Sequence, residues 1–410
     1  MSTANARAIR QLLAFCVRPG ECELPANEAE WDALLPLALA HGVAPMLFAN
    51  LRERVLPVRA RDQLRLVYLS NSFRNEKLLA EQHRILDAFS KKSLAAWPLK
   101  GPHLSEHLYG DPAVRQVADL DLLIRPEDLA ACDDVLHSLG YARQAQGEIA
   151  ELRGAGELLY LKQSQPEELS KDRERFVGHG FNRVESLAPG EAPSGASAPE
   201  VPASGPLPTF AVDLQQRVLP YGQRDPLAGR IRALGLTPEN LLLLLCVNQI
   251  AHRFARLKYL LDVAACLRKL PGNFDWKNFT ATARLLDFTP GIYWSLAWAR
   301  AVAAAPVPES VLETLRPGWF SRKLAARALG ADPVAPLARG AALDGPAGAW
   351  AILVCTRPGL APLRQFWSLL FPPSATLRQE FFATPNRPIL YLYLARLARK
   401  LPAALRPRKQ

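Results

Sequence analysis

Residues 116–124, QVADLDLLI, place two carboxylates two positions apart in an otherwise apolar run. The run predicts a β-strand, whose side chains alternate between faces, so Asp119 and Asp121 share one face while Leu120 and Leu122 point to the core. Two carboxylates about 6–7 Å apart repel each other, and a buried charge is costly without a partner. The stretch therefore predicts a strand with a divalent-cation site at its rim. The alternative is a pair of exposed edge acids bridged to arginines.

The segments around this strand alternate between strand and helix patterns. Residues 93–101, SLAAWPLKG, predict a short strand that ends in a glycine turn. Residues 102–110 predict one or two helical turns after a proline, and residues 126–142 predict a helix with acids in its first turn. This strand–helix–strand–helix order indicates an α/β unit.

Helical patterns flank this unit on both sides. We expect an N-terminal helical region over residues 1–92, an α/β core over 93–220 and a C-terminal helical region over 221–410. Residues 187–208 are rich in Ala, Pro, Gly and Ser and have hardly a large apolar side chain. Such a segment cannot offset its ordering entropy by burial, so we expect a disordered insertion there.

A third acid follows the insertion. In residues 210–216, FAVDLQQ, alternation turns the apolar neighbours of Asp213 toward the core and Asp213 to the opposite face. Asp213 can therefore join Asp119 and Asp121 around one cation, and oxygen-only ligation suits Mg²⁺ or Mn²⁺. Glu157 in GELLYLKQ is the rival third acid.

The glycine turn offers a phosphate contact. Gly101 lets backbone N–H groups approach a phosphate closely, a helix N-terminus follows, and Lys100 adds a positive charge. With the three acids, this turn fits metal-assisted nucleotidyl transfer, in which an acceptor hydroxyl attacks a triphosphate and pyrophosphate leaves. Asp213 would help to deprotonate the acceptor. The alternative is that Lys100 and Gly101 only end a strand.

Arg115 and His252 are further candidates for nucleotide binding. Arg115 is either a phosphate ligand or a structural clamp on the turn at Asp111. A helix predicted over residues 237–269 would present three side chains on one face: His252, Arg256 and Tyr259. That face contacts either the nucleotide or acceptor, or a neighbouring domain. His103 and His107 lack the HExxH pattern and a third ligand, so they are interpreted as part of a surface helix face.

These residues resemble the polymerase-β-like nucleotidyltransferase superfamily, and within it a bacterial family of largely uncharacterised nucleotidyltransferases. The family motifs are LKG, Y-x-D-P-x-x-R and D-[IL]-D-hydrophobic, in that order. They are matched by residues 99–101, 109–115 and 119–122. Other segments that are similar to the family are residues 41–51, 212–216, 245–264 and 363–373.

The resemblance implies an α+β fold, with a small mixed-sheet nucleotidyltransferase core flanked by helical regions. It implies an enzyme that moves NMP from an NTP to an acceptor hydroxyl on a sugar, small alcohol, protein or RNA. The implied catalytic and metal-binding residues are Asp119, Asp121 and Asp213. The implied nucleotide-binding residues are Lys100, Gly101, Arg115 and His252.

The sequence differs from the family pattern at three places. Gly101 is followed by Pro102 rather than Ser or Gly, which removes a hydroxyl contact to phosphate. Two glutamines, Gln215 and Gln216, replace the His-Trp after the third acid, and Asn248 replaces the first His of the central helix. These differences support a second hypothesis, a catalytically inactive nucleotide-binding or scaffold protein of the same fold.

Bulk composition indicates an ordinary soluble globular protein, with 49% hydrophobic and 22% charged residues among 410. The net charge of +11 favours anionic partners, but no basic motif interleaved with aromatics points to nucleic acid. Six cysteines without a CxxC pair predict reduced thiols in a cytoplasmic protein. We expect neither a signal peptide nor a membrane span. The basic amphipathic tail at residues 390–400 either packs against other helices or rests on a membrane surface.

Overall fold

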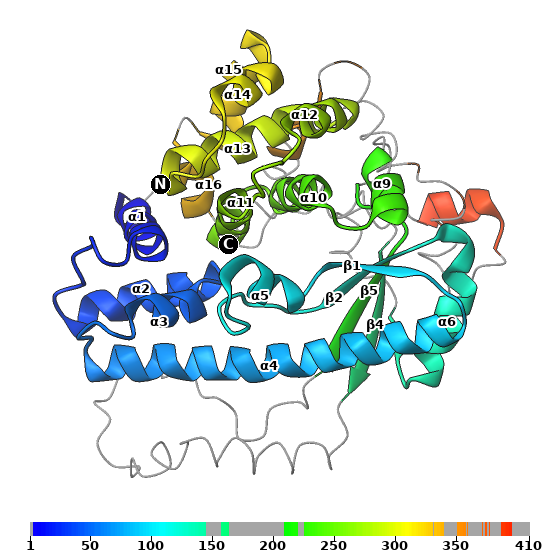
Figure 1. The fold of residues 1–410 in the computed structure, drawn as a ribbon, viewed down its shortest axis with the longest axis horizontal. Helices are drawn as coiled ribbons and strands as arrows, with labels where there is room; N and C mark the ends of the chain where they lie inside the picture. Colours follow the sequence, from blue (N-terminus) through cyan, green and yellow to red (C-terminus); the bar gives the residue numbers. More distant parts are fainter. Residues whose placement is uncertain are drawn as a thin grey trace.

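The computed structural model combines a five-stranded mixed sheet with flanking helices, so the predicted α+β class is confirmed (Figure 1). It describes residues 3–144, 157–163, 209–219, 225–330 and 332–339, and parts of 351–395. The predicted insertion at residues 187–208 and most of the segment 363–373 lie outside the described residues.

Four helices build the N-terminal region: α1 (Thr3–Val17), α2 (Glu28–Ala40), α3 (Ala44–Leu51) and α4 (Val58–Lys91). Asn27 caps α2, because its side-chain oxygen accepts from the backbone N–H of Glu30 at 3.0 Å. A tight turn separates α2 from α3, and Gly42 in that turn has a φ of 69°. Glycine suits this left-handed conformation because it lacks a Cβ.

The sheet is assembled from strands that are far apart in sequence. Its strands are β1 (Ala96–Lys100), β2 (Leu120–Ile124), β3 (Ala142–Arg143), β4 (Glu157–Gln163) and β5 (Thr209–Gln215). Their order is β1-β2-β5-β4-β3, and only the β2–β5 pair is parallel. Three short helices interrupt them: α5 (His103–Tyr109), η1 (Pro126–Asp128) and α6 (Leu129–Ser138). The strand and helix patterns on either side of residues 116–124 thus form the predicted elements.

The two faces of the sheet pack against different helices. Leu122 of β2 and Val212 of β5 belong to a cluster with apolar residues of α4 and α6. Leu123, on the other face of β2, belongs to a cluster with the C-terminal helices. Figure 1 shows α4 along one side of the molecule and α10 and α11 on the other, with the sheet between them. The alternation predicted for β2 therefore turns Asp121 toward the C-terminal helices.

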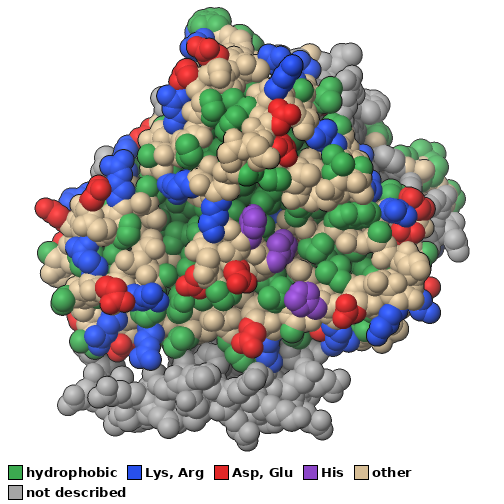
Figure 2. All heavy atoms as spheres, viewed as in Figure 1, with side chains coloured by type: hydrophobic (Ala, Val, Ile, Leu, Met, Phe, Trp, Pro, Cys, Tyr) green, Lys and Arg blue, Asp and Glu red, His purple; other side chains and the backbone are tan. Residues whose placement is uncertain are grey.

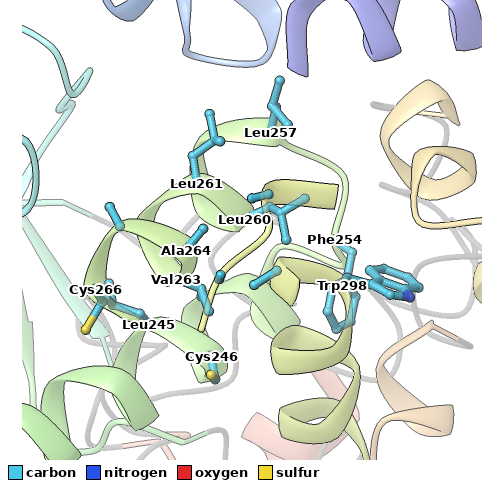
Figure 3. Close-up of a cluster of buried hydrophobic side chains, with 14 of the residues drawn as sticks. Leu245, Cys246, Phe254, Leu257, Leu260, Leu261, Val263, Ala264, Cys266 and Trp298 are labelled. Atoms are coloured by element: carbon cyan, nitrogen blue, oxygen red, sulfur yellow. The ribbon is translucent and has the colours of Figure 1, made fainter. Parts of the chain in front are cut away.

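The C-terminal region consists of α9 (Pro226–Leu234), α10 (Pro238–Ala251), α11 (Leu257–Arg268), α12 (Trp276–Leu285), α13 (Thr289–Ala303), α14 (Glu309–Leu315), α15 (Trp319–Leu329) and α16 (Val334–Arg339). One large hydrophobic cluster joins these helices to α1, α2 and α3 (Figure 3 shows part of it). The helical regions at the two ends of the chain thus share a core. The division into three regions stays a prediction.

The expected continuous helix over residues 237–269 is wrong, because the chain breaks between α10 and α11. Arg253 and Phe254 in the break have φ values of 56° and 58°, which no α-helix contains. Phe254 is 1% exposed and packs edge-on against Trp298, with ring centroids 4.8 Å apart (Figure 3). Burial of this aromatic ring offsets the unfavourable backbone conformation.

All six cysteines are free thiols, four of them buried and two half-buried. Within the described ranges, none of the helices combines the length and the apolar character needed to cross a membrane.

Candidate active site

The pairing of β2 with β5 brings acidic side chains to one face of the sheet. Asp121 is the register partner of Asp213 on the parallel neighbour. Register partners point to the same face, and adjacent strands lie about 4.8 Å apart. Both residues are nearly buried, with 5% and 6% of their surfaces exposed. Asp119 is half-buried and directly precedes β2, so its alignment with Asp121 stays a prediction.

The rival third acid lies elsewhere in the sheet. Glu157 opens β4 and pairs in register with Gln215, whereas Leu159 stands opposite Asp213. The backbone register thus places Asp213, rather than Glu157, beside Asp121.

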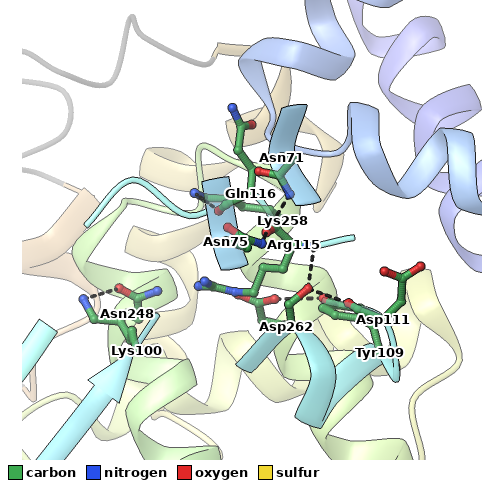
Figure 4. A network of polar contacts seen from close by, with 11 residues as sticks. Asn71, Asn75, Lys100, Tyr109, Asp111, Arg115, Gln116, Asn248, Lys258 and Asp262 are labelled. Atoms are coloured by element: carbon green, nitrogen blue, oxygen red, sulfur yellow. Dashed lines mark hydrogen bonds and ion pairs between the residues drawn. The ribbon is translucent and has the colours of Figure 1, made fainter. Parts of the chain in front are cut away.

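The charge of Asp121 is balanced by Lys100, and Gln215 adds a hydrogen bond. The Lys100 ammonium lies 3.0 Å from Asp121 Oδ1, and the side-chain amide of Gln215 donates to the same oxygen at 2.7 Å. Lys100 also donates to Asn248 Oδ1 on α10 at 3.4 Å (Figure 4). Two residues that differ from the family pattern, Gln215 and Asn248, thus hold the groups around Asp121 in place.

Among the described residues, no three His, Cys, Asp or Glu side chains converge closely enough to hold a metal ion. The Asp121 carboxylate has an ammonium and an amide partner instead. The residue types nevertheless fit Mg²⁺ or Mn²⁺, since Asp119, Asp121 and Asp213 offer only oxygen ligands.

The turn after β1 is closely packed against α4. Gly101 has a φ of 141°, and a Cβ added there would lie 3.2 Å from Gln82 Oε1. Gln82 is 3% exposed, and its Oε1 has no hydrogen-bond partner among the described groups. Any side chain at Gly101 would be strained by its φ and would press on Gln82. The turn therefore requires glycine, as expected of a close backbone approach.

The two histidines of α5 have different surroundings. His107 is exposed, but His103 is half-buried, so the expected surface face is only partly realised. Burial, together with the positive charge of Arg115 and a smaller effect of His107, lowers the pKa of His103 to about 4. His103 is therefore neutral at pH 7. On the face of the molecule drawn in Figure 2, histidine side chains lie near the centre, with basic and acidic side chains spread around them.

Arg115 takes part in a buried network that connects the sheet region to α11 (Figure 4). Its Nε donates to Asp262 Oδ2 at 3.0 Å, and Tyr109 OH donates to Asp262 Oδ1 at 2.8 Å. The nearby carboxylate of Asp262 raises the pKa of Arg115 despite the opposing effect of burial. Asp111 is held instead by Tyr68, whose hydroxyl donates to it at 2.8 Å. Arg115 thus clamps α11 rather than the Asp111 turn, and its contact with phosphate stays a prediction.

His252 lies at the end of α10, next to the break in the helix. Its ring stacks on Tyr259 of α11, with centroids 4.1 Å apart and an angle of 14° between planes. Burial raises the pKa of Tyr259, while Lys100, Arg115 and Arg256 oppose that shift. His252 and Tyr259, which were expected to share one face of a continuous helix, therefore meet across the break between α10 and α11. The basic side chains that act on Tyr259 lie close to them.

All of the candidate site residues lie in the part of the chain that one family model matches. A family model described as uncharacterised nucleotidyltransferase matches residues 27–304. The chain belongs to this family. The match includes the α2–α3 turn, the LKG turn, the three acids and the α10–α11 break, and it ends before residues 363–373. The family supports nucleotidyl transfer as the general function of the chain. Searches of curated proteins and of solved structures gave no match.

Lys258 lies close enough to Asp119 for their charges to interact, which the sequence did not reveal. Its Nζ donates to the backbone oxygen of Gln116 at 3.3 Å, at the start of the segment that leads to Asp119 (Figure 4). The sequence signal was weak, because Lys258 is one basic residue within an amphipathic helix and its contact with residue 116 is purely tertiary.

Proposed function

We propose that this chain transfers NMP from an NTP to an acceptor hydroxyl in a Mg²⁺- or Mn²⁺-dependent reaction. The register pairing of Asp121 with Asp213 supports the proposal most strongly, because it aligns two oxygen-ligand side chains on one face. The glycine turn at Gly101 and the ammonium of Lys100 lie at the end of the strand next to β2, where a phosphate could be bound.

Each residue has a distinct role in this reaction. A divalent cation held by Asp119, Asp121 and Asp213 would neutralise the triphosphate and favour ionisation of the acceptor hydroxyl. Asp213 accepts the proton of that hydroxyl. The acceptor oxygen forms a bond to the α-phosphorus, the bond between the α-phosphorus and the bridging oxygen breaks, and pyrophosphate leaves with that oxygen. Lys100, which pairs with Asp121 in this structure, would contact a phosphate oxygen of the bound triphosphate.

The alternative is a nucleotide-binding or scaffold protein without turnover. It is favoured by the ion pair between Lys100 and Asp121, since an ammonium at that carboxylate performs the charge compensation otherwise expected of a metal. The hydrogen bond from Gln215 to the same oxygen further restrains it. Under this alternative, an NTP binds but no pyrophosphate is released.

Turnover and metal binding test the proposal together. The purified full chain is incubated with radiolabelled NTPs, Mg²⁺ or Mn²⁺ and fractionated cell lysate as the acceptor source, and pyrophosphate release and labelled acceptor are measured. Replacing Asp121→Asn should lower turnover by about two to three orders of magnitude, the usual effect of losing one charge-stabilising group. Electron paramagnetic resonance of Mn²⁺ should show weaker metal binding by the same variant.

Asp134→Asn provides the matched control, because Asp134 is an exposed acid on α6 outside the site. This variant should retain the turnover and the Mn²⁺ signal of the original chain. Equal turnover in the Asp121→Asn variant would contradict the mechanism, and NTP binding without pyrophosphate release would establish the alternative.

The setting of this reaction is also a proposal. We propose a cytoplasmic enzyme whose partners are an NTP and a sugar, small-alcohol, protein or RNA acceptor. The free cysteine thiols support a reducing compartment. The scattered basic side chains in Figure 2 give no support to a nucleic-acid groove on the face shown. A contact between the tail and a membrane surface stays a prediction.

A further inference from the structure

The first residues of α11 are docked on the turn between α2 and α3. His41 accepts from two backbone N–H groups, that of Leu257 through Nδ1 at 3.3 Å and that of Lys258 through its carbonyl oxygen at 3.2 Å. Arg256 adds a third contact, from Nη1 to the backbone oxygen of Ala40 at 3.1 Å. Three consecutive residues at the start of α11 are thus fixed by the N-terminal helices.

The same turn sets the path of the Lys258 side chain. A Cβ added at Gly42 would lie 2.7 Å from Lys258 Cδ and 3.4 Å from Gln116 Oε1. The aliphatic part of Lys258 therefore runs closely over Gly42 toward Gln116, where its ammonium donates to a backbone oxygen. A side chain at residue 42 would displace it.

The three cations near Asp119 differ in their partners. Lys100 pairs with Asp121 and Arg115 pairs with Asp262, but Lys258 donates to a neutral backbone carbonyl. Burial and the charge of Arg115 lower the pKa of Lys258 to about 8, while Asp262 and Asp119 partly oppose that shift. The ammonium also lies 4.9 Å from the ring centroid of Tyr259. A partly buried cation without a bonded carboxylate is suited to bind an anion.

We propose that Lys258 binds a phosphate oxygen of the polyphosphate tail of the nucleotide, and that the Ala40–Gly42 turn positions it beside Asp119. This inference rests on the proposed function, because it takes the bound ligand to be an NTP. It assigns to the N-terminal helices a part in the site: they hold the start of α11 so that a second ammonium, in addition to Lys100, reaches the triphosphate.

Calorimetry with Mg²⁺–tripolyphosphate isolates the tail from the unknown base and acceptor. The Lys258→Met variant should bind tripolyphosphate about tenfold to a hundredfold more weakly, the fold-change that corresponds to one charge-assisted hydrogen bond. The Lys277→Met variant is the control, because Lys277 is exposed on α12, and it should bind as the original chain does. Thermal melting checks that each variant is folded.

A double-mutant cycle tests the positioning role of Gly42. Gly42→Ala alone should weaken tripolyphosphate binding, whereas Gly20→Ala should not, since a Cβ at Gly20 meets no atom within 4 Å. If Gly42 acts through Lys258, the Gly42→Ala/Lys258→Met double variant binds no more weakly than Lys258→Met alone. A merely structural effect of Gly42 would add to that of Lys258.

The outcomes separate this inference from the proposed function. If the original chain and the Lys258→Met variant bind tripolyphosphate equally, the inference is wrong while the proposed function stands. An additive double variant overturns the positioning role of Gly42. If the original chain binds neither tripolyphosphate nor a non-hydrolysable NTP with Mg²⁺, the proposed function fails and this inference fails with it.

Discussion

At the scale of single residues, the protonation state of His41 decides whether its ring can hold the start of α11. It is 4% exposed, and its Nδ1 accepts from the backbone N–H of Leu257. Only a neutral imidazole can accept a hydrogen bond at that nitrogen. Burial and the positive charge of Arg256 accordingly lower the pKa of His41 to about 4. Protonation of this one ring removes an acceptor and adds a positive charge near Lys258.

We therefore expect the free energy of unfolding to fall as the pH falls from 6.5 toward 4. The folded-state pKa of His41 lies below its unfolded value of 6.5, so the unfolded chain binds more protons in that window. The loss attributable to His41 is up to about 3 kcal/mol at pH 4. Urea unfolding at a series of pH values measures it.

The matched variants are His41→Gln and His83→Gln, because His83 is exposed on α4. The His41→Gln variant should show a shallower pH dependence between pH 6.5 and 4, and His83→Gln should show the original dependence. His103, whose pKa is also lowered to about 4, contributes to the loss in the same direction. An unchanged pH dependence in His41→Gln would contradict this assignment.

At the scale of elements, α10 and α13 approach each other closely at Gly291. A Cβ added there would lie 2.5 Å from Ile250 Cδ1 and 3.0 Å from Cys355 Cβ. The backbone N–H of Gly291 also donates to the carbonyl oxygen of Cys355 at 3.1 Å. The glycine thus allows α13 to pack against α10, the helix that carries Asn248 and His252.

Gly291→Ala should destabilise the chain by about 1–3 kcal/mol, because the added methyl group overpacks this contact. Gly229→Ala in α9 is the control, since its Cβ meets no atom within 4 Å and alanine favours the helix by up to about 1 kcal/mol. Adding Ile250→Val, which removes Cδ1, should recover part of the loss. Chemical denaturation measures the free energy of unfolding of each variant. An unchanged free energy of unfolding in Gly291→Ala would contradict the close packing.

The elements also show what could be predicted from the sequence. Alternating residues predicted a strand in 210–216 and a strand in 116–124, although the latter begins only at Leu120, because burial acts on neighbouring residues. The break between α10 and α11 was missed, since neither Arg253 nor Phe254 favours a left-handed conformation and the packing against Trp298 is tertiary. Lys258 was missed for the same reason: its site contact comes from a distant segment.

At the scale of the whole molecule, one buried ion pair connects the sheet region to the C-terminal helices. Arg115 and Asp262 are 5% and 1% exposed, and Tyr109 donates to the same carboxylate. The pair fixes α11 against the chain segment that leads into β2. Removing one partner leaves an uncompensated charge in the interior, which is more harmful than removing both.

Asp262→Leu and Arg115→Met should each destabilise the chain by about 3–5 kcal/mol, and the double variant should lose less than the sum. The control is Glu309→Gln, which breaks the exposed pair with Arg300 and should change stability by less than about 1 kcal/mol. Chemical denaturation gives each free energy of unfolding. Additive losses would show that Arg115 and Asp262 stabilise the chain independently.

The parallel pairing of β2 with β5 also has a consequence for the order of assembly. Asp121 and Gln215 are 94 positions apart, so the chain must close a long loop before the acids meet. During synthesis β1, α5 and β2 emerge well before β5, and the buried residues of β2 then have an open edge. Asp121 and Asp213 therefore come together late in folding, and until then the apolar residues of β2 are exposed to mispairing.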